Sequence, residues 1–145
     1  MKQLNKSGAE VMKKYCIRGA TDVTGFGLAG HALKMAKASN VTIKFNMKKV
    51  PLIGNVYTLV EDGCIPGASF RNLDFVEEYL FSAPGIDYNL KMISFDAQTS
   101  GGLLMSVASQ IAEAVLKDLH NVGLTSATII GEVTELQEKH IQLQN

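Results

Sequence analysis

The strongest constraint on the fold is a glycine-rich turn that runs into a helix with one face of small side chains. Gly25, Gly27 and Gly30 all fall within residues 24–31, and the helix that they open is predicted to reach about Ala38. The small residues recur at helical spacing on one narrow face: Ala29, Ala32, Leu33 and Ala36. Such a face lets a helix approach a β-sheet closely. We therefore expect this helix to cover a sheet.

Strand and helix patterns alternate along the rest of the chain. β-Branched and polar residues alternate over residues 41–46 and predict a strand. Further strands or extended segments are expected at residues 90–95, 103–107, 127–133 and 141–143, and further helices at residues 1–19, 51–63 and 109–120. Residues 65–72 are expected to form a loop, and residues 73–81 fit either a short helix or irregular structure. This interleaving predicts an α+β domain with one mixed β-sheet flanked by helices.

The expected helix ends depend on a few local signals. Ser7 with Glu10 three residues later has the spacing of a capping box, and Gly19 is a typical stop. Pro51 suits the first turn of the helix over residues 51–63. Ser109 is expected to cap the helix over residues 109–120.

Length and charge limit the class of protein. The 145 residues suit one domain, residues 1–145, and 46% of them are hydrophobic against 19% charged. Fourteen basic and fourteen acidic residues give zero net charge, so we expect neither a nucleic-acid partner nor a polybasic membrane surface. Residues 103–108 are far shorter than the ~20 apolar residues of a membrane span. No secretion signal is recognised either, so a soluble, cytoplasmic protein is expected.

The two cysteines carry little chemical signal. Cys16 lies in a helical pattern and is expected to be packed, whereas Cys64 lies in a turn. Neither has the spacing of a zinc site, and two reduced thiols are the favoured interpretation. A catalytic thiol at Cys64 remains an alternative, although nothing near it in sequence would lower its pKa.

The first segment with chemical content is residues 21–31, TDVTGFGLAGH. Asp22 precedes a turn in which Gly25 and Gly27 leave the backbone open to a ligand. The first turn of a helix favours phosphate, and a neighbouring carboxylate suits Mg²⁺ bridging phosphate oxygens. The alternative is an aspartate that caps a turn and glycines that allow close packing. Spacing alone favours this alternative, because the segment is neither a P-loop nor G-x-G-x-x-G.

The second segment is residues 96–104, DAQTSGGLL, directly before an expected strand. Its donors and small residues suit either an anion or nucleotide loop or a hydrogen-bonded turn that starts the strand.

Both segments resemble signatures of the selenide, water dikinase (selenophosphate synthetase) family. Pro66-Gly67, Arg71-Asn72 and residues 130–133 resemble further landmarks of that family in the same order. Ala97 departs from the proline that is usual in the family. The resemblance implies the C-terminal domain fold of the aminoimidazole ribonucleotide synthetase-like superfamily. It also implies an enzyme that converts selenide, ATP and water to selenophosphate, AMP and phosphate.

The resemblance covers only the C-terminal half of such an enzyme. It implies that the catalytic cysteine or selenocysteine, its lysine and most metal-binding aspartates belong to an N-terminal ATP-binding domain, so no catalytic residue is expected in this chain. Asp22 matches a family aspartate that binds Mg²⁺ at the ATP phosphates, and Thr24, Gly25 and Gly27 are the expected phosphate-binding residues. The expected partners are the protein's own N-terminal domain and a second copy in a homodimer. The 145-residue chain alone is expected to be inactive.

Two other interpretations remain. The chain could be the C-terminal domain of another ATPase of the superfamily, from purine synthesis or hydrogenase maturation, or a stand-alone binding module. His31 is expected to be structural rather than catalytic. Arg71 fits either a phosphate contact or a surface salt bridge.

Overall fold

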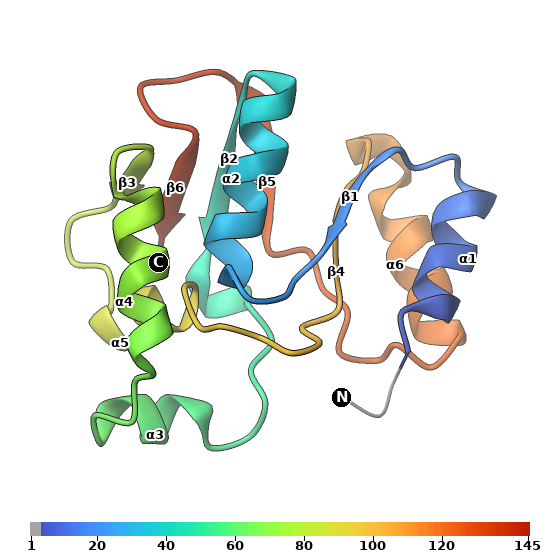
Figure 1. The fold of residues 1–145 in the computed structure, drawn as a ribbon. Helices are drawn as coiled ribbons and strands as arrows, with labels where there is room; N and C mark the ends of the chain where they lie inside the picture. Colours follow the sequence, from blue (N-terminus) through green and yellow to red (C-terminus); the bar gives the residue numbers. More distant parts are fainter. Residues whose placement is uncertain (1–3) are drawn as a thin grey trace.

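The computed structural model describes residues 4–145 (Figure 1). It contains six α-helices and six strands, in the order α1 (Lys6–Lys14), β1 (Gly19–Asp22), α2 (Gly27–Ser39), β2 (Val41–Asn46), α3 (Val56–Glu61), α4 (Gly67–Glu77), β3 (Leu80–Ser82), α5 (Tyr88–Ile93), β4 (Leu103–Ser106), α6 (Ala112–Asn121), β5 (Gly131–Glu135) and β6 (Ile141–Gln144). Two 3-10 turns, Met47–Lys49 and Ser109–Ile111, complete the regular structure. The α+β class expected from the sequence is confirmed.

The main layer is a four-stranded mixed sheet in the order β3-β6-β2-β5. β2 is antiparallel to β5 and parallel to β6, and β3 is parallel to β6. Helix α2 lies against this sheet (Figure 1). Its small inner face is at most 1% exposed and packs in the same core as four sheet residues: Ile43, Phe45, Ile141 and Leu143. The helix-on-sheet arrangement predicted from the alanine pattern is therefore confirmed.

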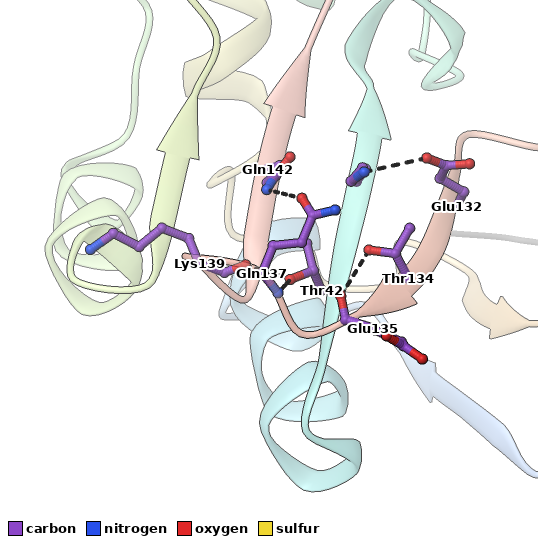
Figure 2. Close-up of polar contacts among 8 residues, drawn as sticks. Thr42, Glu132, Thr134, Glu135, Gln137, Lys139 and Gln142 are labelled. Atoms are coloured by element: carbon purple, nitrogen blue, oxygen red, sulfur yellow. Dashed lines mark hydrogen bonds and ion pairs between the residues drawn. The ribbon is translucent and has the colours of Figure 1, made fainter.

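The opposite face of the sheet is polar, because successive strand residues point to alternate faces. Figure 2 shows the turn between β5 and β6 hydrogen-bonded to this face. The Thr42 hydroxyl donates to the Lys139 carbonyl at 2.7 Å and accepts from the Gln137 N–H at 2.8 Å. The Gln142 side chain donates to that of Gln137 at 2.8 Å. These bonds satisfy Thr42 and Gln142, which are both buried.

A second, smaller layer lies beside the main sheet. β1 and β4 form an antiparallel pair with α1 and α6 alongside (Figure 1), and Val11, Val115 and Leu119 form a separate small core. The expectation of one sheet is therefore wrong in this respect. The mixed sheet has four strands, and β1 and β4 pair with each other instead of joining it.

Three expectations for the middle of the chain are also wrong. Residues 90–95 were expected to be extended, but α5 forms because the Asp87 carboxylate caps it by accepting the Leu90 N–H at 2.9 Å. Residues 65–72 were expected to be a loop, but Pro66 immediately precedes α4 and has extended backbone angles, so it starts the helix. α3 begins only at Val56, after Asn55 in a left-handed conformation.

Several helix ends also differ from the sequence expectation. α1 has no capping box at Ser7, since Asn5 occupies the N-cap position without a side-chain hydrogen bond. The helix stops well before Gly19, because Cys16 has a positive φ of 54°, and Cys16 is exposed rather than packed. Residues 1–3 of the expected helix lie outside the described residues. Ser109 begins a 3-10 turn before α6 and provides no side-chain cap.

Within residues 4–145, none of the helices combines the length and apolar character that crossing a membrane requires.

Candidate functional site

The two segments singled out in the sequence lie side by side in the structure. Their contact begins where Asp22 of β1 pairs with Leu103 of β4 and continues beyond the strands. The Val23 N–H donates to the Gly102 carbonyl at 3.0 Å. In return, the Gly101 N–H donates to the Val23 carbonyl at 2.9 Å. The glycine-rich turn and the loop over residues 96–102 are therefore one hydrogen-bonded unit.

Thr24 connects the same unit to the start of α2. Its carbonyl accepts the N–H groups of Gln98 at 3.1 Å and Gly27 at 3.0 Å. Its hydroxyl shares a 3.0 Å hydrogen bond with the Nε2 atom of His31. Backbone and side chain of Thr24 are both engaged, so the shape of the turn is fixed from two sides.

Asn72 joins this unit to α4. Its amide group donates to the Gly25 carbonyl and to the Phe95 carbonyl, each at 2.9 Å. The side chain is only 8% exposed. Its bond to Phe95 is buried, whereas its bond to Gly25 is partly buried. One buried amide thus links the glycine-rich turn to the end of α5.

Gly27 has a reason to be glycine that involves no ligand. Its φ is +69°, and a Cβ atom there would lie 2.7 Å from the Phe95 carbonyl carbon. The residue is buried, and its N–H already donates to Thr24. Ala29 is similarly engaged, because its N–H donates to the Ser94 carbonyl at 2.9 Å. Close packing of α2 on residues 94–96 therefore accounts for this glycine.

Asp22 and Gly25 form the open edge of the unit. Both residues are exposed, and a Cβ atom placed on Gly25 would meet nothing within 4 Å. The Gly25 backbone is therefore open to a ligand, and Asp22 is accessible from solvent as well. Of the four residues predicted to bind metal or phosphate, these two are the accessible ones.

His31 lies behind the turn and is 9% exposed. Burial lowers the pKa of its imidazole, and the nearby positive charge of Lys34 lowers it further, against the opposing effect of Asp22. The ring also meets that of Phe26 edge-on, with centroids 5.8 Å apart. A neutral, hydrogen-bonded imidazole is suited to supporting the turn.

Asp96 follows α5 and starts the second motif. Its carboxylate accepts a hydrogen bond from the Gln98 side chain. Burial raises the pKa of this carboxyl group, and the Gln98 bond only partly opposes the effect. Asp96 and Asp22 thus occupy different environments, one half-buried and one exposed.

Comparison with known proteins identifies the domain. Residues 2–144 match the C-terminal domain of AIR synthase related proteins. The chain belongs to this family. It is 51% identical over 136 residues to a protein named selenide, water dikinase from Porphyromonas gingivalis, a match that covers 93% of this chain and 38% of the relative. Proteins of the same name from Clostridioides difficile and Caldanaerobacter subterraneus are each 40% identical, over 141 and 144 residues. These matches cover 97% and 99% of this chain, and 40% and 42% of the relatives.

The chain therefore spans about two fifths of the length of the curated relatives it matches. Among the residues that the structure describes, no group of three or more histidine, cysteine or acidic side chains could hold a metal ion. Asp22 offers one carboxylate, and Mg²⁺ commonly uses one or two protein carboxylates together with phosphate oxygens and water. The chemistry of Asp22 therefore allows it to serve as one ligand of a Mg²⁺ ion.

Sequence reasoning missed the part that Asn72 plays. The pair Arg71-Asn72 stands out in the sequence only as a family landmark within an expected loop. In the structure Arg71 is exposed on α4 while Asn72 points into the site. Asn72 is a polar residue on the buried face of α4, together with Ser69 and Val76. Its place in that helical repeat is the sequence signal that would have identified Asn72.

Proposed function

We propose that this chain is the C-terminal domain of a selenide, water dikinase. The whole protein would make selenophosphate from selenide, ATP and water, with AMP and phosphate as the other products. One observation carries the proposal: the exposed Asp22 and the open Gly25 lie together where the two family-like segments are hydrogen-bonded to each other. The names of the relatives, all selenide, water dikinase, support the same activity.

In this proposal Asp22 holds one side of a Mg²⁺ ion at the ATP phosphates. The ion, when bound, neutralises phosphate charge during transfer. Gly25 leaves room for a phosphate group beside the carboxylate, because even an added Cβ atom would meet nothing within 4 Å there. Thr24 and Gly27, the other two expected phosphate-binding residues, act mainly by fixing the turn, because their hydrogen-bonding groups are already engaged.

The remaining catalytic groups are proposed to come from the protein's own N-terminal domain. That domain would supply the catalytic cysteine or selenocysteine and further metal-binding aspartates, and the whole enzyme would be a cytoplasmic homodimer. Asp22 alone cannot complete an octahedral Mg²⁺ site. The 145-residue chain by itself is therefore expected to show no turnover of ATP with selenide.

The test uses the longer protein that contains this chain. AMP formation is measured with ATP and Mg²⁺, with and without selenide. We expect AMP to form only with selenide, and Asp22→Ala to lower its rate by roughly 100-fold or more, because losing metal-assisted charge stabilisation costs several kcal/mol. Asp62→Ala, which removes an exposed aspartate after α3, is the matched control and should leave the rate unchanged.

Two results would contradict the proposal. AMP or ADP formation that is indifferent to selenide would assign the chain to another ATPase of the superfamily. An Asp22→Ala protein with the melting temperature and the activity of the wild type would show that Asp22 holds no metal.

A further inference from the structure

A pocket with a polar lining lies on the polar face of the main sheet, whereas Asp22 belongs to the smaller layer. Figure 2 shows that the turn between β5 and β6 covers the part of this face around Thr42 and Gln142. The pocket lies further along β2, where the face is open to solvent, and has a volume of about 250 Å³. Its main lining residues are Lys44, Asn46, Lys49, Ile129, Glu132 and Gln144.

The Lys44 side chain in this pocket is mostly covered and yet lacks a hydrogen-bond partner. It is only 18% exposed, but within residues 4–145 its ammonium group makes no hydrogen bond. Its ion pair with Glu132 is 3.7 Å long, which exceeds hydrogen-bond distance, and Glu132 is itself 68% exposed. An ammonium group has three donors, and removing it from water is costly unless acceptors replace that water. Lys44 therefore brings unused donors to the pocket.

Three further side chains add donors to the same pocket. Lys49 contributes a second ammonium group from the 3-10 turn after β2, and Gln144 contributes an amide from β6. The Asn46 side-chain oxygen already accepts the Lys48 N–H at 3.1 Å, so the amide NH₂ group of Asn46 is left to donate. The pocket thus combines two cationic and two amide donors with the carboxylate of Glu132. Positive charge exceeds negative charge there, although the chain as a whole is neutral.

This set of donors fits a phosphate group. Phosphate oxygens accept several charge-assisted hydrogen bonds at once, and lysine is a common phosphate ligand. The two ammonium groups would repel a metal cation, and an apolar molecule would leave their charges without acceptors. One water molecule needs about 10–15 Å³ of such space, so a pocket of about 250 Å³ has room for the five heavy atoms of a phosphate group.

We propose that this pocket binds a phosphate group, either of inorganic phosphate or of a small phosphate ester. The ammonium groups of Lys44 and Lys49 contact the phosphate oxygens, and the amides of Asn46 and Gln144 donate further hydrogen bonds. The Glu132 carboxylate moves away from Lys44 when phosphate binds, because both anions compete for the same ammonium group. A long ion pair with an exposed partner contributes little stability, so this displacement costs little.

The test is an NMR titration of the ¹⁵N-labelled 145-residue chain with inorganic phosphate, at an ionic strength held constant with chloride. We expect the backbone N–H signals of Asn46, Gly131 and Gln144 to shift and to saturate. The Gly25 signal reports separately on the phosphate contact proposed beside Asp22, so either proposal can fail without the other. Glycerol 3-phosphate, titrated in the same way, distinguishes the two sources of the phosphate group: tighter binding of the ester assigns the pocket to an ester, and equal or weaker binding assigns it to free phosphate.

Two variants should change phosphate binding in opposite directions. Lys44→Gln should weaken it at least about tenfold, the effect of losing one charge-assisted hydrogen bond. Glu132→Gln should strengthen it severalfold, because the variant removes a negative charge beside the ligand. Lys117→Gln is the matched control, because it removes an equal positive charge from an exposed position on α6, and it should leave the Kd unchanged.

Three results would overturn the proposal. The first is the absence of saturable shifts at the pocket in the wild type, which decides the question even if a variant does not fold. The second is equal weakening by Lys44→Gln and Lys117→Gln, which would show a general effect of charge. The third is phosphate binding that Glu132→Gln leaves unchanged or weakens, which would place the anion away from Lys44.

Discussion

Replacing Asn72 with alanine should destabilise the domain by about 2 kcal/mol. The Asn72 amide is 8% exposed and donates to two carbonyls, those of Gly25 and Phe95, at 2.9 Å each. The Phe95 bond is buried, and leaving a buried carbonyl unpaired costs about 1–3 kcal/mol. The Gly25 carbonyl lies at the open edge, where water replaces the lost donor for about 0.5 kcal/mol. Alanine forms helix more readily than asparagine, which offsets roughly 0.6 kcal/mol of this loss of stability in α4.

Urea denaturation followed by circular dichroism measures this effect. We expect a lower midpoint and an unchanged slope, with a melting temperature lower by about 4–8 °C for a chain of this size. Asp74→Ala, an exposed position on the same helix, should change the unfolding free energy by about 0.5 kcal/mol or less. An Asn72→Ala protein as stable as Asp74→Ala would refute the assignment of Asn72 as the residue that joins the glycine-rich turn to the end of α5.

Three further predictions concern the same region and α5. Gly27→Ala should destabilise the domain by more than about 1 kcal/mol, because the φ of Gly27 is +69° and a Cβ atom there would meet Phe95. Gly25→Ala, the control, should leave the urea midpoint almost unchanged. Equal urea midpoints for the two variants would contradict this. The Tyr57 hydroxyl and the Leu90 N–H lower the pKa of Asp87. The stability that ionised Asp87 gives the domain should therefore vanish as the pH falls below the ordinary value of 3.8. Asp87→Asn should flatten that part of the profile of unfolding free energy against pH. Burial lowers the pKa of His31 below 6.5, so the domain should lose stability as the pH falls below 6.5; a His31→Gln variant with the same pH profile would contradict this.

The helix-on-sheet core could be predicted because its signal is periodic. Ala29, Ala32 and Ala36 repeat on one helical face, and residues 41–46 alternate as a strand does. Both patterns follow directly from which side chains are buried, and the helix and the strand formed where they were expected. The prediction for residues 90–95 is wrong because a short apolar run fits a buried strand and a buried helix equally well. The outcome depended on Asp87, whose carboxylate caps α5.

The candidate site was only partly predictable for a related reason. The sequence placed Asp22 beside a glycine-rich turn, but it could not separate a glycine open to ligand from a glycine required by packing. That distinction rests on contacts across the fold, which leave Gly25 open and press Gly27 against Phe95. Asn72 was missed because its two acceptors lie 47 and 23 residues away in the chain.

The magnesium dependence of the proposed selenide-dependent AMP formation tests the proposed role of Asp22 most directly. In the longer protein that contains this chain, we predict that Asp22→Asn raises the Mg²⁺ concentration for half-maximal rate at least about tenfold, because a neutral amide is a weaker ligand than a carboxylate. Asp62→Asn should follow the wild-type curve. An Asp22→Asn protein with the magnesium dependence of the wild type would contradict the assignment of Asp22 as a metal ligand.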